Sequence, residues 1–201
     1  MTDRRSLLAL AAGSLLVPGL ARAQQAADPR LGERSAGKPD APVTVIEYFS
    51  LTCGHCAAFH RDTWPRVKTE LVDTGKMRMV FRDFPLDQTA LLGHQIARAL
   101  PAERYEGFIS TLFATVDRWA FARGSDPRTE LARLAALAGM PRAEFDAAAN
   151  DQALARGILE IRLQGQQQHN VNSTPTFVFG SRVVPGNMPF DRFAALVAET
   201  R

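Results

Sequence analysis

The hydrophobic pattern changes period along the chain, and its first part predicts a strand, a helix and a second strand. Residues 43–49 form a short β-branched and aromatic run, which is typical of a strand buried in a sheet. Residues 53–73 carry apolar side chains at helical spacing, with Pro65 expected to kink the helix and Gly75 to end it. Residues 76–82 alternate polar and apolar side chains, as a strand does. This order predicts two parallel strands joined by a right-handed crossover.

Residues 87 to about 170 are rich in Ala and Leu at helical spacing, which predicts a helical insertion. Caps and breakers divide it into helices near 88–99, 102–119, 127–138, 141–149 and 151–168. A β-hairpin at 176–184 and an amphipathic helix at 189–199 follow. The predicted fold class is therefore α/β, with a helical domain inserted between an N-terminal βαβ unit and a C-terminal ββα unit.

The first 23 residues have the pattern of an export signal. Arg4 and Arg5 precede a Gly-interrupted apolar stretch, and Ala21-Arg22-Ala23 fits a cleavage site. The paired arginines are compatible with twin-arginine export as well as with the Sec route. Residues 24–42 contain several Pro and Gly and little periodicity, so we expect an irregular N-terminal arm before a domain at 43–201.

Composition indicates one soluble globular domain. The chain has 201 residues, of which 46% are hydrophobic and 22% are charged. Its 24 basic and 21 acidic residues give a net charge of +3, and removal of the predicted signal lowers this to +1. A balanced surface of this kind does not indicate a nucleic-acid partner.

The two cysteines of the chain, Cys53 and Cys56, indicate redox chemistry. They form Cys-Gly-His-Cys after a predicted strand and at the start of a predicted helix. A disulfide across so short a loop contributes little stability, which favours a bond that opens and closes. The helix start favours a thiolate at Cys53, and His55 can add a positive charge or a hydrogen bond. Cys53 is therefore predicted as the exposed attacking sulfur, and Cys56 as its buried partner.

A carboxylate in the first strand, Glu47, lies six residues before Cys53 in an otherwise apolar run. One interpretation is that it points into the core beneath the cysteines and exchanges a proton with Cys56. The alternative is that it reaches solvent or pairs with a basic residue. The spacing alone does not separate the two.

Together these features resemble the thioredoxin superfamily, and more closely its DsbA-like exported thiol-disulfide oxidoreductases. The resemblance rests on the acidic strand, the Cys-x-x-Cys at a helix start, the helical insertion, and Thr174-Pro175-Thr176-Phe177 before the hairpin. It implies a thioredoxin-like fold, Cys53 as nucleophile, Glu47 as buried acid, and Thr174-Pro175 as a cis-proline loop that binds substrate.

The resemblance also implies a periplasmic enzyme that donates its disulfide to cysteine pairs in newly exported proteins, with no cofactor besides the Cys53–Cys56 bond. A membrane-bound, quinone-linked DsbB-like protein would reoxidise it. Gly54 departs from the proline usual in DsbA-type sites and matches the tetrapeptide of eukaryotic disulfide isomerases, so a periplasmic reductase or isomerase is the alternative. The segment 24–42 is too short for the dimerisation domain of the DsbC and DsbG isomerases, which favours a monomeric oxidase.

Two further expectations concern the surroundings of the cysteines. Cys53, Cys56 and His60 could supply three ligands to a metal ion, although no second cysteine pair completes a closed site. Leu51, Phe59 and Met188 are candidates for an apolar face that contacts peptide. His94 and His169 are expected to be ordinary surface or hydrogen-bonded side chains.

Overall fold

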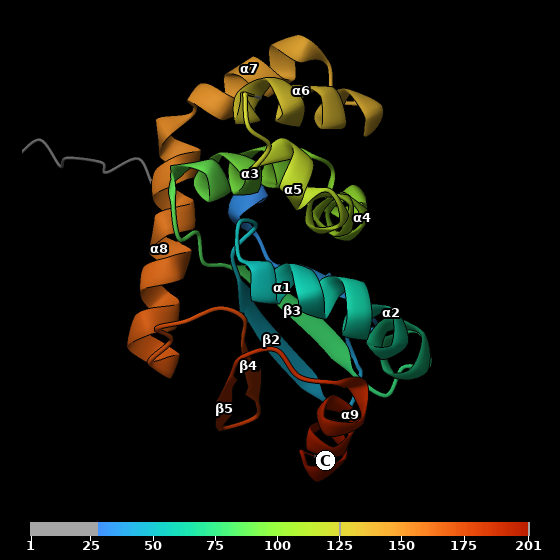
Figure 1. Ribbon diagram of the computed structural model, residues 1–201. Helices are drawn as coiled ribbons and strands as arrows, with labels where there is room; N and C mark the ends of the chain where they lie inside the picture. Colours follow the sequence, from blue (N-terminus) through green and yellow to red (C-terminus); the bar gives the residue numbers. More distant parts are fainter. Residues whose placement is uncertain (1–27, 125, 201) are drawn as a thin grey trace, which may run out of the picture.

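A single mixed sheet forms the centre of the protein. The computed structural model describes residues 28–124 and 126–200, and within them five strands follow the order β1-β3-β2-β4-β5 (Figure 1). The strands are β1 Arg34–Ala36, β2 Thr44–Phe49, β3 Arg78–Asp83, β4 Thr176–Phe179 and β5 Arg182–Pro185. The β2–β3 pair is parallel and the other pairs are antiparallel, which confirms the predicted strand–helix–strand unit. The export signal predicted at 1–23 lies outside the described residues.

The helix between β2 and β3 is continuous but irregular. It comprises α1 (Gly54–Ala58), a π-helical segment η2 (Phe59–Thr63), α2 (Trp64–Val67) and a second π-helical segment η3 (Lys68–Val72). Directly before Pro65, the N–H of Trp64 donates to the carbonyl of Phe59, five residues back. Proline has no N–H and crowds the preceding turn, so the irregularity expected at Pro65 takes the form of a widened turn.

Six helices lie between β3 and β4 in the described part of the chain. They are α3 (Gln88–Ala99), α4 (Ala102–Ala114), α5 (Val116–Trp119), α6 (Pro127–Leu137), α7 (Arg142–Asn150) and α8 (Gln152–His169). The prediction of a single helix over 102–119 is wrong, because the helix breaks at Thr115. There the Trp119 indole N–H donates to the Leu112 carbonyl at 2.8 Å, the acceptor that a continuing helix would offer to residue 116.

The N-terminal arm also differs from the expectation. Residues 34–36 are not irregular: they form β1, which pairs antiparallel with β3 and places Ser35 opposite Val80. A short 3-10 helix, η1 (Pro29–Leu31), precedes it. Three residues are too few to show a period of two, so the pattern could not predict this strand. The sheet therefore begins before residue 43.

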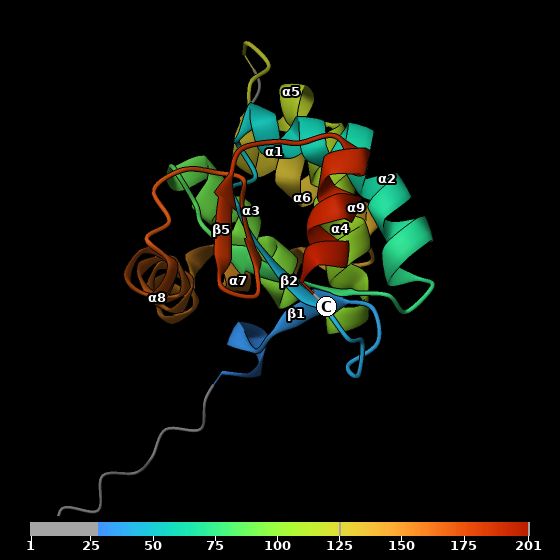
Figure 2. The same ribbon diagram turned by 90° about the horizontal axis from the view of Figure 1, so that it is seen from below.

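Helices cover both faces of the sheet. Figure 2 shows α1, α2 and α9 (Phe190–Glu199) on one side and α8 on the other. A Cβ at Gly165 would lie 2.5 Å from the Tyr48 ring, so a glycine is needed where α8 crosses the sheet. The main core fills the side of α1, where the alternate β2 residues Val45 and Phe49 are fully buried. Glu47 lies between them in β2 and faces the same side.

In the described residues we find no helix with the length and apolar character needed to span a bilayer.

Candidate functional site

The two cysteines lie at the carboxyl end of β2, where the chain turns into α1. Cys53 is the N-cap residue of α1, and Cys56 lies in its first turn. Both are free thiols. Cys53 retains 9% of its surface exposed and Cys56 none. Both cysteines are thus buried, and the exposure predicted for Cys53 is limited to this small fraction, whereas Cys56 is fully enclosed.

Hydrogen bonds favour the thiolate form of Cys53. The Cys56 thiol makes the largest contribution, and the backbone N–H groups of Cys56 and His55 add to it. These contacts outweigh burial and lower the pKa of Cys53 from 9.0 to about 5. A nucleophile with this pKa is almost fully ionised at neutral pH.

The Cys56 thiol has the opposite environment. Burial raises its pKa well above 9.0, and the adjacent Cys53 sulfur and the Glu47 carboxylate raise it further. Cys56 therefore keeps its proton while Cys53 is ionised. The position of Cys53 at the helix start predicts that it is the more acidic of the two thiols. The Glu47 carboxylate increases the difference, because its charge raises the pKa of Cys56.

His55 contributes through its backbone. Its side chain is exposed in α1, and the hydrogen bond that lowers the pKa of Cys53 comes from its N–H group. The His55 imidazole was expected to stabilise the Cys53 thiolate, but it is not among the groups that lower the pKa of Cys53. A helix N-terminus offers such N–H groups for any residue type other than proline, so the identity of residue 55 is not what supplies this donor.

Both interpretations of Glu47 hold in part. Its carboxylate is fully buried beneath the cysteines, and it also pairs with a basic residue, since both of its oxygens lie 3.1 Å from Nε2 of His60. The pair is shielded from solvent, with 1% of the His60 side chain and none of the Glu47 side chain exposed. His60 is thus occupied by Glu47, and among the described residues no group of three His, Cys, Asp or Glu side chains could hold a metal ion.

The Thr174–Pro175 peptide bond is cis, and it brings the loop before β4 against Cys53. The Thr174 carbonyl lies 3.2 Å from the Cys53 sulfur and accepts from the thiol when it is protonated. Behind it, the Gly186 N–H donates to the Pro175 carbonyl at 2.7 Å, which ties this loop to the segment after β5. Residues 121 positions apart in sequence therefore meet at one sulfur.

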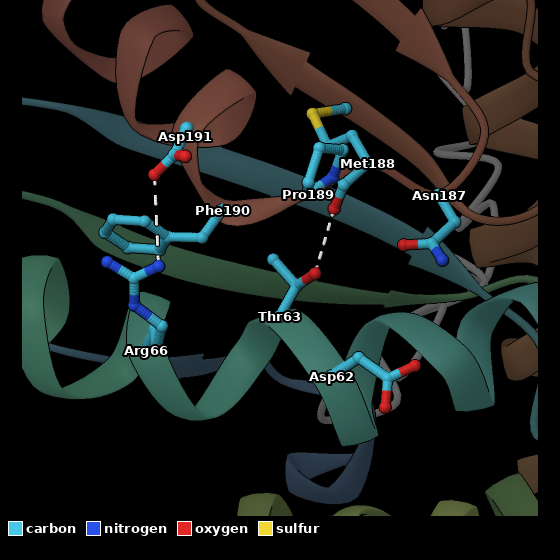
Figure 3. Close-up of a pocket in the computed structure, with 8 residues that line it drawn as sticks. All are labelled: Asp62, Thr63, Arg66, Asn187, Met188, Pro189, Phe190 and Asp191. Atoms are coloured by element: carbon cyan, nitrogen blue, oxygen red, sulfur yellow. Dashed lines mark hydrogen bonds and ion pairs between the residues drawn. The ribbon is translucent and has the colours of Figure 1, made fainter.

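The prediction that Leu51, Phe59 and Met188 form an apolar peptide-binding face around the cysteines is wrong. Leu51 and Phe59 are fully buried and Met188 is 2% exposed, so all three belong to the core. A hollow with a volume of about 450 Å³ is lined by Met188 and by a mixture of polar and apolar residues that includes Asp62 and Asn187 (Figure 3). The residues drawn at its edge include Arg66, which lies over the Phe190 ring at 3.9 Å.

Sequence reasoning missed a buried polar cluster where β3 ends. The Asp83 carboxylate accepts from Tyr105 at 2.9 Å, pairs with Nδ1 of His94 at 2.8 Å, and forms an ion pair with Arg98. All four side chains are almost completely buried. His94 is hydrogen-bonded, as expected for an ordinary histidine, but lies in the core. The only signal in the sequence is the spacing of His94 and Arg98, four residues apart on one helix face.

Alkylation should show the thiolate directly. We expect the alkylation rate of Cys53 in the reduced protein to rise with pH, reach half its maximum near pH 5 and level off by neutral pH, because the rate follows the thiolate fraction. The measurement is a pH series with iodoacetamide, with the labelled cysteine identified by mass spectrometry. A midpoint near that of free cysteine, about pH 8.5, would contradict the proposed environment.

The parallel strand–helix–strand unit, the paired cysteines at a helix start and the cis-proline loop define a thioredoxin-like protein with a helical insertion. A family model described as Thioredoxin matches residues 30–199, and the chain belongs to this family. Its fold is DsbA-like: alpha-DsbA1 of Wolbachia pipientis superposes with a TM-score of 0.78 at 29% identity, over 84% of this chain and 90% of that one. BdbD of Bacillus subtilis shares the fold, with a TM-score of 0.72 at 18% identity, over 86% of this chain and 94% of that one.

Curated relatives point the same way. A Rickettsia felis protein named as a protein-disulfide oxidoreductase is 27% identical over 162 residues, which is 80% of this chain and 57% of the relative. A second, from Rickettsia prowazekii, is 29% identical over 146 residues, covering 72% of this chain and 53% of that protein. The chain thus spans little more than half the length of these relatives.

Proposed function

We propose that the protein is a thiol-disulfide oxidoreductase that donates a Cys53–Cys56 disulfide to cysteine pairs in newly exported proteins. The observation that carries this proposal is the unequal pair of sulfurs, one ionised at the start of α1 and the other buried and protonated. Stabilisation of the Cys53 thiolate favours the reduced protein, so the disulfide form is an oxidant. The redox-active disulfide serves as the only cofactor.

In the proposed reaction a substrate thiolate attacks the Cys53 sulfur of the oxidised protein. A bond forms between the substrate and Cys53, the Cys53–Cys56 bond breaks, and its electron pair goes to the Cys56 sulfur, which takes the proton that the Glu47 carboxyl carries in the oxidised protein. A second substrate thiolate then attacks the first substrate sulfur and releases the Cys53 thiolate. The substrate is oxidised by two electrons, and the cysteine pair is reduced.

The Thr174–Pro175 loop is the proposed contact for the substrate backbone. It lies against Cys53 and precedes β4, so an extended substrate segment can align beside it as an added strand. We further propose that the protein acts as a monomer in the periplasm, on proteins that contain cysteines. A membrane-bound, quinone-linked protein of the DsbB kind would restore its disulfide.

Redox titration tests the direction of electron flow. The purified protein is equilibrated with glutathione buffers, and its reduced fraction is measured by thiol alkylation. Thioredoxin has a reduction potential of about −270 mV, and we expect the potential of this protein to be well above that value. A value as low as that of thioredoxin would reject the oxidase and favour the reductase or isomerase. The Cys-Gly-His-Cys sequence is the reason for considering this alternative. A Cβ at Gly54 would meet no atom within 4 Å, so the surrounding structure does not require glycine at this position.

The free energy of unfolding should also depend on the redox state of the cysteines, because the Cys53 thiolate stabilises the reduced folded protein. The pKa of Cys53 falls from 9.0 to about 5, and at pH 7 this favours the reduced folded state by about 3 kcal/mol, or about 60 mV. Because the folded pKa is the lower one, the contribution is complete above pH 9 and is mostly lost by pH 5. Urea unfolding of both forms at pH 7 and pH 5 measures it. An oxidised form that is the more stable at pH 7 by several kcal/mol would contradict the proposal.

A further inference from the structure

His60 is a buried imidazole with an incomplete set of hydrogen bonds. Its Nε2 lies 3.1 Å from both oxygens of Glu47. An ionised carboxylate only accepts hydrogen bonds, so Nε2 carries the hydrogen and donates it. Its other nitrogen, Nδ1, is buried and has no hydrogen-bond partner among the described residues. The ring is therefore anchored at one point, and that point is Glu47.

Aromatic rings enclose the imidazole. Phe113 of α4 stacks on it with a centroid distance of 4.3 Å, and four more rings lie 5.6 to 6.3 Å away: Phe49, Phe59, Trp64 and Phe81. These come from β2, β3 and the helix that carries His60. The titratable group that faces the ring in the described contacts is Glu47 on β2. Without His60, the Glu47 carboxylate would have no described side-chain donor in an apolar environment.

The helix places His60 close to the reacting sulfur. His60 follows Cys56 by four residues, so the two side chains lie on one face of the helix, one turn apart. The Glu47 charge acts on the Cys56 thiol, which shows that carboxylate and sulfur are near each other. Three side chains from two elements, β2 and the α1–η2 helix, thus meet in one closed space.

We propose that His60 is a positioning residue for Glu47: its Nε2–H holds the carboxyl group beside Cys56, so that the group can give its proton to the Cys56 sulfur when the disulfide opens. The inference rests on the proposed function. In the oxidised protein the Glu47 carboxyl carries the proton. When a thiolate breaks the Cys53–Cys56 bond, the electron pair passes to Cys56, the proton moves from Glu47 to that sulfur, and Glu47 is left as the carboxylate that faces His60 in the reduced protein. His60 neither gains nor loses a proton and donates the same hydrogen bond before and after.

Two substitutions separate positioning from proton transfer by the ring. His60→Gln keeps an N–H donor but cannot titrate near neutral pH, whereas His60→Phe keeps an aromatic ring and loses the donor. The rate measured is the opening of the oxidised protein by dithiothreitol in quenched flow, with thiols counted by alkylation. We expect His60→Phe to open about tenfold to a hundredfold more slowly, and His60→Gln to stay within about threefold of the wild type.

His94 provides the matched control. It is also a buried histidine paired with a carboxylate, at 2.8 Å from Asp83, but it belongs to the other cluster. His94→Gln and His94→Phe should lower stability and leave the opening rate within about twofold of the wild type. A wild-type rate in folded His60→Phe would overturn the inference, and so would an equal loss in His60→Gln and His60→Phe.

Imidazole ¹⁵N spectra test the contact without any variant of His60. We expect hydrogen on Nε2 of His60 in both redox states, with a signal that shifts on oxidation of the cysteines, while the His94 signal does not move. A His60 signal that is unchanged by oxidation would overturn the inference. A wild-type protein whose disulfide does not react with thiols would instead reject the proposed function, so the two failures are distinguishable.

Discussion

Replacement of Cys56 by serine is expected to abolish turnover completely while leaving Cys53 reactive. The variant has no disulfide to donate, but its Cys53 thiolate still attacks the disulfide of oxidised glutathione. The resulting mixed disulfide cannot be resolved from within the protein, because the group that would attack it is gone. We therefore expect the variant to accumulate a single glutathione per chain, measured by mass spectrometry of the intact protein.

Cys53→Ser is the matched control, since it removes the other sulfur of the same pair. The remaining thiol, Cys56, is fully buried and its pKa is raised well above 9.0 by burial, so it should form no adduct in the same time. Both variants should lose all oxidation of a reduced substrate peptide. Equal adduct formation by the two variants would reverse the assignment of attacking and buried sulfur.

The sequence predicts these roles from local geometry. A strand that ends four residues before Cys53, and a helix that starts directly after it, place the first sulfur at unpaired N–H groups and the second inside the first turn. The parallel β2–β3 pair and the closing hairpin follow from local periodicity in the same way. The strand and helix bounds were predicted to within about two residues in this part of the chain.

Features that depend on contacts between distant segments could not be predicted in this way. The partner of Glu47 is His60, thirteen residues away on a different element, and the spacing left its environment open. Likewise, an apolar pattern around the cysteines cannot distinguish a peptide-binding face from core, and Leu51 proved to be core. Periodicity identifies the face of an element but does not identify what covers it.

Resemblance and structure contribute different information about the Thr174–Pro175 loop. Its position against Cys53 is a contact across 121 residues, which the family resemblance predicts. The physical reasoning from residues alone assigned no contact to this loop. The family model and the alpha-DsbA1 structure support the fold that brings the loop there, while the substrate it binds remains part of the proposed function.

Loss of the Asp83 charge is expected to cause the largest loss of stability that a single substitution in the described polar network produces. Asp83→Asn leaves the Arg98 guanidinium, which is fully buried, without its counter-charge. Removal of one partner of a buried ion pair costs about 3–5 kcal/mol, a large share of the about 5–15 kcal/mol that stabilises a typical domain. Urea unfolding should show a lower midpoint with little change in slope.

Glu199→Gln is the control for this substitution, because it makes the same chemical change in an exposed pair with Arg182, where it should cost less than about 1 kcal/mol. The pH dependence gives a second check. Burial alone would raise the pKa of Asp83, but Arg98 and His94 outweigh it and hold the pKa well below its usual range. The contribution of Asp83 is therefore present above about pH 4 and lost only in stronger acid. The destabilisation of Asp83→Asn relative to the wild type should persist at pH 5 and shrink only in stronger acid. Equal losses in Asp83→Asn and Glu199→Gln would show that burial of the first pair does not matter.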